Sequence, residues 1–336
     1  MQYLYTLTST PGDNYYEQFL LSAASLKLKM PSTQIVLLCD SKTKETLTGK
    51  RSEYEKLTAK VITKDAPSSF SQVDVSRWIK TSMRRFVQGD FLFIDCDTII
   101  TDDLSYIEKL NVKFGACLDK HSLVDSHNNK NLIVNNDKQL GFSSYTGNRH
   151  FNSGVIYCAD SPEIHKVFDR WHELWLIGKN KNISRDQPAF NQAIHENLSL
   201  FTELDGIWNC QIAYNGLPYL ANSKIIHYFA TDNIYIESPY LLTSESILEY
   251  IKNYGIINDE TLKLLENPRR AFKEKTQIMA GNDMLYVVNS NLFQFIYLLK
   301  KKSPLFYNFL NSICSTLKKI TKGILIRSKK KKNIYN

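Results

Sequence analysis

The fold of this chain is decided by the stretch FLFIDCDTII, residues 91–100. Its leading apolar residues predict a buried β-strand, and Asp95 and Asp97 follow at the carboxyl end of that strand. Ligands bind at this edge of open α/β sheets. Two neighbouring acids repel each other there unless they share a proton or a cation. The stretch therefore predicts a site for a divalent metal that carries a phosphate.

The beginning of the chain predicts an α/β sheet of mostly parallel strands. Residues 3–7 and 34–39 are β-rich, and residues 15–28 between them have helical spacing. A strand, a helix and a strand in this order imply parallel pairing. Thr8 and Asp40 follow the two strands at the edge where nucleotides bind, so we predict that both contact a bound nucleotide.

The composition assigns the positive charge to the C-terminus. The chain has 336 residues and a net charge of +8, and from Lys300 onward it carries eleven Lys or Arg and no acid. The preceding residues are slightly acidic, which argues against binding of nucleic acid. The six cysteines show no CxxC pair, no apolar run is long enough to span a bilayer, and no signal peptide is evident. We therefore expect a cytoplasmic protein.

A helix is predicted to begin at the segment SRDQ, residues 184–187. Ser184 and Gln187 have the spacing of a capping box, and Asp186 lies where a negative charge favours the helix dipole. A helix that starts at a pocket would also fix Asp186 and Gln187 as ligand contacts. Both interpretations stay open at this stage.

Several short motifs together resemble glycosyltransferase family 8, which contains glycogenin and bacterial lipopolysaccharide galactosyl- and glucosyltransferases. The resemblance covers roughly residues 1–235 and implies a GT-A fold, a Rossmann-like mixed, mostly parallel sheet flanked by helices. It also implies a nucleotide-sugar donor, usually a UDP sugar, an Mn²⁺ cofactor and retention of anomeric configuration. The motifs in chain order are Asp95-Cys96-Asp97, Phe151-Asn152-Ser153-Gly154-Val155, Asp186-Gln187, Trp208-Asn209 and Ile225-Ile226-His227-Tyr228.

The resemblance implies that Asp95 and Asp97 are metal ligands and that His227 is the third. Two carboxylates and a neutral imidazole suit Mn²⁺ or Mg²⁺ and leave coordination positions open for diphosphate oxygens. A metal there would stabilise the charge of the departing nucleoside diphosphate.

The same resemblance implies which residues hold the donor. Lys80 resembles a lysine that contacts the diphosphate, although Arg77 and Arg84 share its predicted helix face. Asn152 and Gly154 resemble the segment that lines the sugar pocket, where an amide offers a donor and an acceptor and a glycine permits close approach.

Asp186 and Gln187 resemble the catalytic pair that faces the reacting carbon of the sugar, and Asn209 resembles a further donor contact. Because an amide oxygen is a poor nucleophile, we favour attack by the acceptor from the leaving-group face, with Gln187 stabilising positive charge on the sugar. The chain lacks the lysine that family members often carry shortly after the position of His227.

Two alternative functions remain at this stage. Haloacid-dehalogenase-like phosphatases also carry an apolar strand that ends in Asp-x-Asp, and there the first Asp is a nucleophile. Here the motif lacks the usual Gly, a β-α-β unit precedes it, and no second acidic pair is evident after a later strand. A non-catalytic nucleotide-sugar-binding protein is the other alternative.

We predict a GT-A catalytic domain over residues 1–250 and a helical, basic C-terminal region over residues 251–336. The function expected from the resemblance is transfer of a hexose to a saccharide or lipid-linked acceptor in cell-surface polysaccharide synthesis. Residues 300–302 and 329–332 are lysines that flank apolar residues at helical spacing, which suits an anionic membrane surface at the inner face of the cell membrane. The alternative is a helix that packs on the catalytic domain. The apolar residues are Leu305, Phe306, Phe309, Leu310, Ile313 and Leu317.

Overall fold

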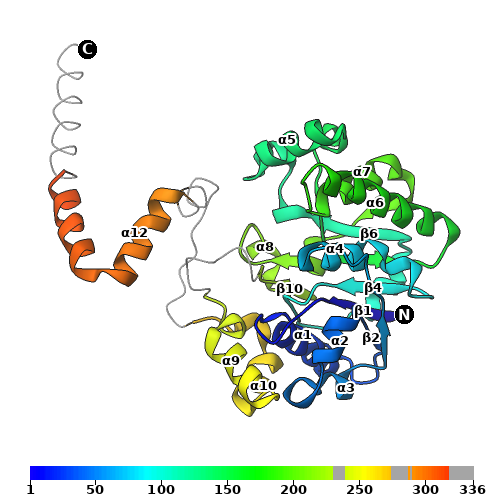
Figure 1. Ribbon diagram of the computed structural model, residues 1–336, viewed down its shortest axis with the longest axis horizontal. Helices are drawn as coiled ribbons and strands as arrows, with labels where there is room; N and C mark the ends of the chain where they lie inside the picture. The colour runs from blue at the N-terminus through cyan, green and yellow to red at the C-terminus, as the bar shows by residue number, and fades with distance from the viewer. Residues whose placement is uncertain (230–238, 274–286, 288–289, 318–336) are drawn as a thin grey trace, which may run out of the picture. The chain divides into compact units, whose positions relative to one another are not determined.

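The computed structural model describes residues 1–229, 239–273, 287 and 290–317 (Figure 1). The chain divides into two compact units. The first comprises Met1–Asp232 and Ser238–Thr276, and the second comprises Asn233–Glu237 and Gln277–Asn336. The first unit therefore extends past residue 250. The lysines predicted to flank the apolar face at residues 329–332 lie outside the described residues.

A seven-stranded mixed sheet forms the centre of the first unit, in the order β3-β2-β1-β4-β7-β6-β8. All neighbouring pairs are parallel except those that β7 makes with β4 and β6. The strands are β1 (Gln2–Leu7), β2 (Ile35–Cys39), β3 (Lys60–Thr63), β4 (Phe91–Ile94), β6 (Phe114–Leu118), β7 (Phe151–Cys158) and β8 (Phe201–Glu203).

A second, smaller sheet begins where β4 ends. Its order is β5-β10-β9, with β5 (Thr98–Ile100) antiparallel to β10 (Ile225–His227) and β10 parallel to β9 (Cys210–Gln211). The polypeptide thus leaves the large sheet at Ile94 and enters the small one at Thr98, and the two acids predicted to bind metal lie in the turn between them.

Helices cover both faces of the large sheet (Figure 1). Side chains of β4 alternate between the two cores, because Leu92 and Ile94 pack with α1 on one face while Phe91 and Phe93 pack with α4, α6 and α7 on the other. The helices of the first unit are α1 (Tyr15–Lys29), α2 (Ser41–Thr46), α3 (Tyr54–Leu57), α4 (Gln72–Ser82), α5 (Lys130–Leu140), α6 (Pro162–Asn180), α7 (Gln187–Glu196), α8 (Leu217–Leu220), α9 (Glu245–Tyr254) and α10 (Asp259–Glu266).

Helices α9 and α10 belong to the first unit because they pack beside α1. Lys252 of α9 donates a hydrogen bond to the Asn14 side chain at 2.7 Å, and Lys29 of α1 donates to the carbonyl of Glu266 at 2.8 Å. Leu248, Ile251 and Leu265 from these helices are buried in the same core as α1. The catalytic unit is therefore larger than its strands alone indicate.

The sheet confirms the predicted fold class, whereas two local predictions are wrong. Residues 119–150 are not mostly loop, because they contain α5 and short 3-10 turns. Ser184 is not a helix cap, because α7 begins at Gln187 after Asp186, and the Ser184 carbonyl instead accepts a hydrogen bond from the Trp175 indole at 3.0 Å. That tertiary contact competes successfully with the local capping pattern.

The described part of the second unit consists of α12 (Asn291–Lys302) and the helical residues 304–317. Ser290 caps α12 by accepting a hydrogen bond from the Phe293 amide, and no side chain of α12 is buried. Across the described residues, the chain holds no helix with the length and apolar character needed to span a bilayer.

Candidate active site at the Asp95–Asp97 turn

Backbone pairing on both sides of the turn brings the predicted metal ligands together. The Asp95 amide donates to the Gly154 carbonyl at 2.8 Å, which extends the pairing of β4 with β7 by one residue. On the other side, Thr98 of β5 lies opposite His227 of β10, and the Tyr228 amide donates to the Asp97 carbonyl at 3.2 Å. Residues more than a hundred positions apart are therefore placed by sheet register.

The side chains of Asp95, Asp97 and His227 each offer one ligand atom, and these atoms all lie within 4.8 Å of one another. His227 Nε2 is 3.2 Å from an Asp97 carboxylate oxygen. Burial and the neighbouring Asp97 raise the pKa of Asp95 against the opposing effect of Lys80. Burial disfavours the imidazolium of His227, but the Asp97 carboxylate raises its pKa nevertheless. The cluster favours bound positive charge, and its oxygen and imidazole donors fit Mn²⁺ or Mg²⁺.

Gly154 leaves the space in which these three side chains meet. A Cβ atom added at Gly154 would lie 2.5 Å from His227 Cε1 and 3.0 Å from Asp95 Oδ2. Real side chains do not approach that closely, so only glycine permits the two ligands to converge beside β7. This close approach is the physical reason for the predicted glycine.

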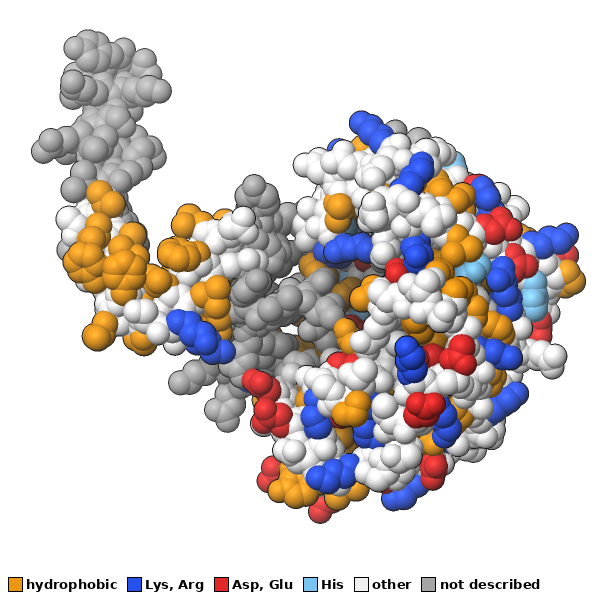
Figure 2. Space-filling view, in the orientation of Figure 1, with side chains coloured by type: hydrophobic (Ala, Val, Ile, Leu, Met, Phe, Trp, Pro, Cys, Tyr) orange, Lys and Arg blue, Asp and Glu red, His pale blue; other side chains and the backbone are white. Residues whose placement is uncertain are grey.

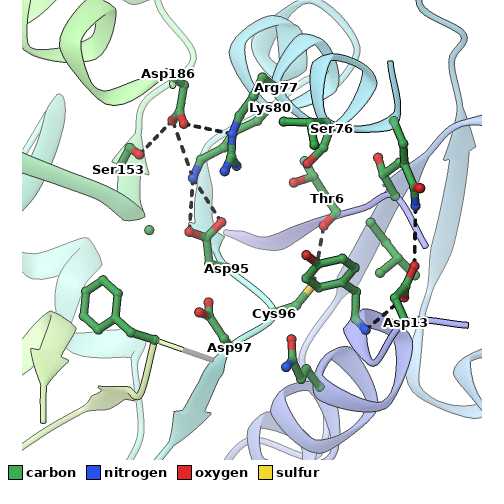
Figure 3. Close-up of a pocket in the computed structure, with 18 of the residues that line it drawn as sticks. Thr6, Asp13, Ser76, Arg77, Lys80, Asp95, Cys96, Asp97, Ser153 and Asp186 are labelled. Atoms are coloured by element: carbon green, nitrogen blue, oxygen red, sulfur yellow. Dashed lines mark hydrogen bonds and ion pairs between the residues drawn. The ribbon is translucent and has the colours of Figure 1, made fainter. Parts of the chain in front are cut away.

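Two cations on α4 compensate the carboxylates of the site. Lys80 Nζ lies 3.1 Å from both oxygens of Asp95 and 3.7 Å from Asp186, and Figure 3 shows it between the two acids. Arg77, one helical turn earlier, lies 3.3 Å from Asp186. Lys80 is only 3 % exposed, so its charge is held where water cannot screen it well.

Asp186 is held in place by several partners at the start of α7. Its Oδ2 accepts a hydrogen bond from the Ser153 hydroxyl at 2.8 Å, and its carbonyl accepts one from the Trp171 indole at 3.2 Å. Burial opposes ionisation of this carboxyl, but Lys80, Arg77 and Ser153 together lower its pKa to about 2. Asp186 is therefore a fixed carboxylate at the mouth of α7.

These side chains line a cavity of about 560 Å³ within the first unit. Two predicted residues do not line it: Asn209 lies behind His227, and Asp40 is buried at the start of α2. Asp40 is kept from the cavity because α2 begins immediately after it. The predicted residues that line the cavity are Thr8, Lys80, Asp95, Asp97, Asn152, Gly154, Asp186, Gln187 and His227.

The sequence prediction missed other residues of the site. Ser153 was passed over because it lies between the two predicted residues of its strand, yet it lines the cavity and binds Asp186. Phe229 stacks on His227, with ring centroids 4.1 Å apart and planes 8° apart, at a left-handed φ of 52°. Asp119 follows β6 as Asp95 follows β4, and the same strand-end pattern could have identified it.

Comparisons with known proteins identify the class to which this fold and site belong. A family model described as glycosyl transferase family 8 matches residues 13–232, which is more than half of the chain. The chain therefore belongs to glycosyl transferase family 8. It is a glycosyltransferase of GT-A type, as the resemblance of its motifs predicts, and the phosphatase alternative loses its support. A comparison with curated proteins finds no match.

Solved structures with a similar fold are also glycosyltransferases. The apo form of mouse xyloside xylosyltransferase 1 is 13 % identical and aligns over 70 % of this chain and 99 % of its own, with a TM-score of 0.47. The glycosyltransferase GlyE of Streptococcus pneumoniae TIGR4 is 16 % identical and aligns over 83 % of this chain and 67 % of its own, with a TM-score of 0.45.

Gly154→Ala should weaken binding of Mn²⁺ roughly 10- to 100-fold, because the new methyl group forces apart two ligands that second-layer contacts normally orient. Isothermal titration with Mn²⁺ measures the effect. Gly147→Ala is the matched control, since nothing lies within 4 Å of a Cβ at that position. Equal affinities of Gly154→Ala and wild type would contradict this account of the site.

Arg77→Gln should raise the pKa of Asp186 from about 2 toward its ordinary value of 3.8. The stabilisation from ionised Asp186 is complete above the unfolded pKa and is lost as pH falls through the folded pKa. The variant should thus be less stable than wild type at neutral pH, and the difference should vanish as the pH falls to about 2.

Urea unfolding across this pH range measures the difference between Arg77→Gln and wild type. Arg270→Gln serves as the control, because Arg270 is exposed and lies away from the Asp186 side chain. A stability difference that stays constant from neutral pH to acid would contradict the assigned ion pair.

Proposed function

We propose that the protein transfers a hexose from a nucleotide sugar, a UDP sugar, to a saccharide or lipid-linked acceptor with the help of Mn²⁺ or Mg²⁺. The observation that carries this proposal is the convergence of Asp95, Asp97 and His227 on one wall of a cavity of about 560 Å³. The size suits a small organic ligand. Family membership supports a nucleotide-sugar donor.

A metal at this cluster would act as a Lewis acid toward the diphosphate of the donor. The residues of the chain supply the remaining charge compensation. Lys80 lies beside Asp95 and is oriented toward the same cavity, so it offers a cation to a phosphate oxygen. Arg77 also lines the cavity, and its partly exposed guanidinium takes the role of a second phosphate contact, which the missing lysine after His227 leaves vacant.

The contacts of Asp186 support attack by the acceptor from the leaving-group face, with retention of configuration. Both oxygens of Asp186 are engaged, one by Arg77 and the other by Ser153 and Lys80. A carboxylate with a pKa of about 2 that is held this firmly is a weak nucleophile and a good orienting group. Gln187, the next residue, lines the cavity and offers an amide oxygen to positive charge on the sugar. A glycosyl adduct trapped on Asp186 would overturn this mechanism.

Asp97→Asn should lower metal-dependent release of UDP from UDP sugars at least ~100-fold, because a neutral amide replaces a charged metal ligand. Asp103→Asn, which changes an exposed acid outside the cavity, should match wild type. Release of phosphate from simple monoesters by the wild type would point to a phosphatase. Metal-dependent donor binding without turnover on any acceptor would point to a binding protein.

We also propose that the C-terminal unit attaches the enzyme to the anionic inner face of the cell membrane, where cell-surface polysaccharide precursors are assembled. Figure 2 shows hydrophobic side chains gathered on its described helices. Leu305 is 87 % exposed and Phe309 is 61 % exposed. Lys300, Lys301 and Lys302 lie between the two helical segments, and residues 290–317 contain no acid. Apolar side chains beside clustered lysines suit an anionic lipid surface.

Replacing Lys300, Lys301 and Lys302 by glutamine should weaken binding to phosphatidylglycerol vesicles about 100-fold, since each lysine near such a surface contributes about 1 kcal/mol. Co-sedimentation with vesicles measures the change. Replacing three exposed lysines of the first unit, Lys50, Lys60 and Lys109, is the matched control. Unchanged binding by the C-terminal triple variant, or equal loss in the control, would contradict the attachment.

A further inference from the structure

A buried chain of hydrogen bonds leads away from His227, behind the cavity. His227 Nδ1 is 3.0 Å from Asn209 Oδ1, and Asn209 Nδ2 donates to Asn152 Oδ1 at 2.9 Å. Asn209 is fully buried, and His227 and Asn152 are 3 % and 4 % exposed. Buried amides keep a fixed orientation when each end has a partner of defined polarity.

The orientation of the Asn152 amide is set independently at both of its ends. Its oxygen accepts the Gly154 backbone N–H at 2.9 Å, and a backbone amide can only donate. Its nitrogen donates to Asp119 Oδ1 at 2.9 Å, and an ionised carboxylate can only accept. Asn152 therefore presents its oxygen to Asn209.

This orientation fixes the next two groups in turn. Asn209 must direct its NH₂ group toward the Asn152 oxygen, so its own oxygen faces His227. His227 must then donate through Nδ1, which leaves Nε2, 3.2 Å from Asp97, as the atom available to an ion. We propose that Asp119, Asn152 and Asn209, here called the amide relay, are positioning residues that hold the Nδ1 proton of His227 and so make Nε2 the metal-binding atom. This inference rests on the metal role in the proposed function.

The far end of the amide relay is anchored by a second imidazole. His127 Nε2 lies 3.0 Å from Asp119 Oδ2, and His127 Nδ1 accepts the backbone N–H of Asn129 at 2.9 Å. The proton of neutral His127 is therefore on Nε2 and is donated to Asp119. Burial opposes ionisation of Asp119, but the hydrogen bond from His127, with His150 and Asn152, holds its pKa well below the usual range. Donors thus converge on the Asp119 carboxylate from both directions.

The turn that presents Asp119 is strained and braced. Lys120 and His121, directly after it, have left-handed φ values of 53° and 50°, which non-glycine residues rarely adopt. The Lys120 amide donates to Gln211 Oε1 at 2.6 Å, and Gln211 Nε2 donates to the Leu118 carbonyl at 2.7 Å. Gln211 lies opposite His227 in the pairing of β9 with β10. Strain of this kind persists where the surroundings over-determine a functional geometry.

Two variants at Asn209 separate positioning of the metal ligand from a purely structural role. Asn209→Asp keeps an acceptor for the Nδ1 proton, whereas Asn209→Leu fills the space without one. A structural role predicts that Asp, a buried charge, does more harm than Leu. The amide relay predicts that Asn209→Asp stays within a few-fold of wild-type Mn²⁺ affinity, and that Asn209→Leu loses roughly 10- to 100-fold.

A remote variant tests whether the effect is transmitted along the amide relay. Asp119→Asn cannot accept from both His127 and Asn152, so it should weaken Mn²⁺ binding about tenfold although it touches no metal ligand. Asp137→Asn, the same change at another fully buried acid, should bind Mn²⁺ as wild type does. Isothermal titration with Mn²⁺ on the full chain measures each affinity, and thermal unfolding confirms that each variant is folded.

Proton NMR edited by ¹⁵N supplies a readout independent of metal and activity. The Nδ1 proton of His227, assigned by its absence in His227→Gln, should be hydrogen-bonded and slow to exchange in wild type and Asn209→Asp. It should exchange fast in Asn209→Leu. An Asn209→Leu variant that keeps the slow proton, or an Asp119→Asn variant with unchanged Mn²⁺ affinity, would overturn the inference. If wild type binds no Mn²⁺, the proposed metal function fails, while the proton pattern still decides the relay.

Discussion

The site depends on one electrostatic constraint, which is the placement of three carboxylates in a largely buried space. Asp95, Asp97 and Asp186 come from separate parts of the chain, and none can stay ionised there without nearby positive charge. Lys80 answers most of this demand, because it contacts Asp95 and lies within ion-pair distance of Asp186. The remaining negative charge lies toward Asp97, next to His227. A cation at that end would complete the balance, which explains why the cavity is charged on all sides yet stable.

The architecture delivers these charges through strand ends and helix starts, with little use of flexible loops. Strand β4 ends at Asp95, β10 ends at His227, and α7 begins after Asp186. Asp97 lies in the short link between the two sheets, where pairing of β5 with β10 fixes its distance from His227. Groups fixed in this way need no reorganisation when a ligand arrives, and such preorganisation is what makes charged sites effective.

The sequence was sufficient to predict features that depend on local pattern. The apolar run before Asp95 and the helical spacing around Lys80 correctly predicted a strand end and a helix, because each depends on a short stretch of chain. The pairing of β5 with β10 involves residues far apart, and only tertiary packing determines their register. For the same reason Asn209 was predicted to contact the donor but supports His227 from behind. Asp40 was predicted from its strand end alone, which does not show that α2 follows at once.

The stacking of Phe229 on His227 makes access to the imidazole one-sided. The two rings are nearly parallel at 4.1 Å, so one face of the imidazole is fully covered by an aromatic surface. Phe229 is itself braced edge-on by Tyr214, with ring centroids 5.2 Å apart. A molecule in the cavity must therefore approach His227 along its ring edge or its uncovered face. The pair acts as a directional screen, which restricts the angle of approach without narrowing the cavity.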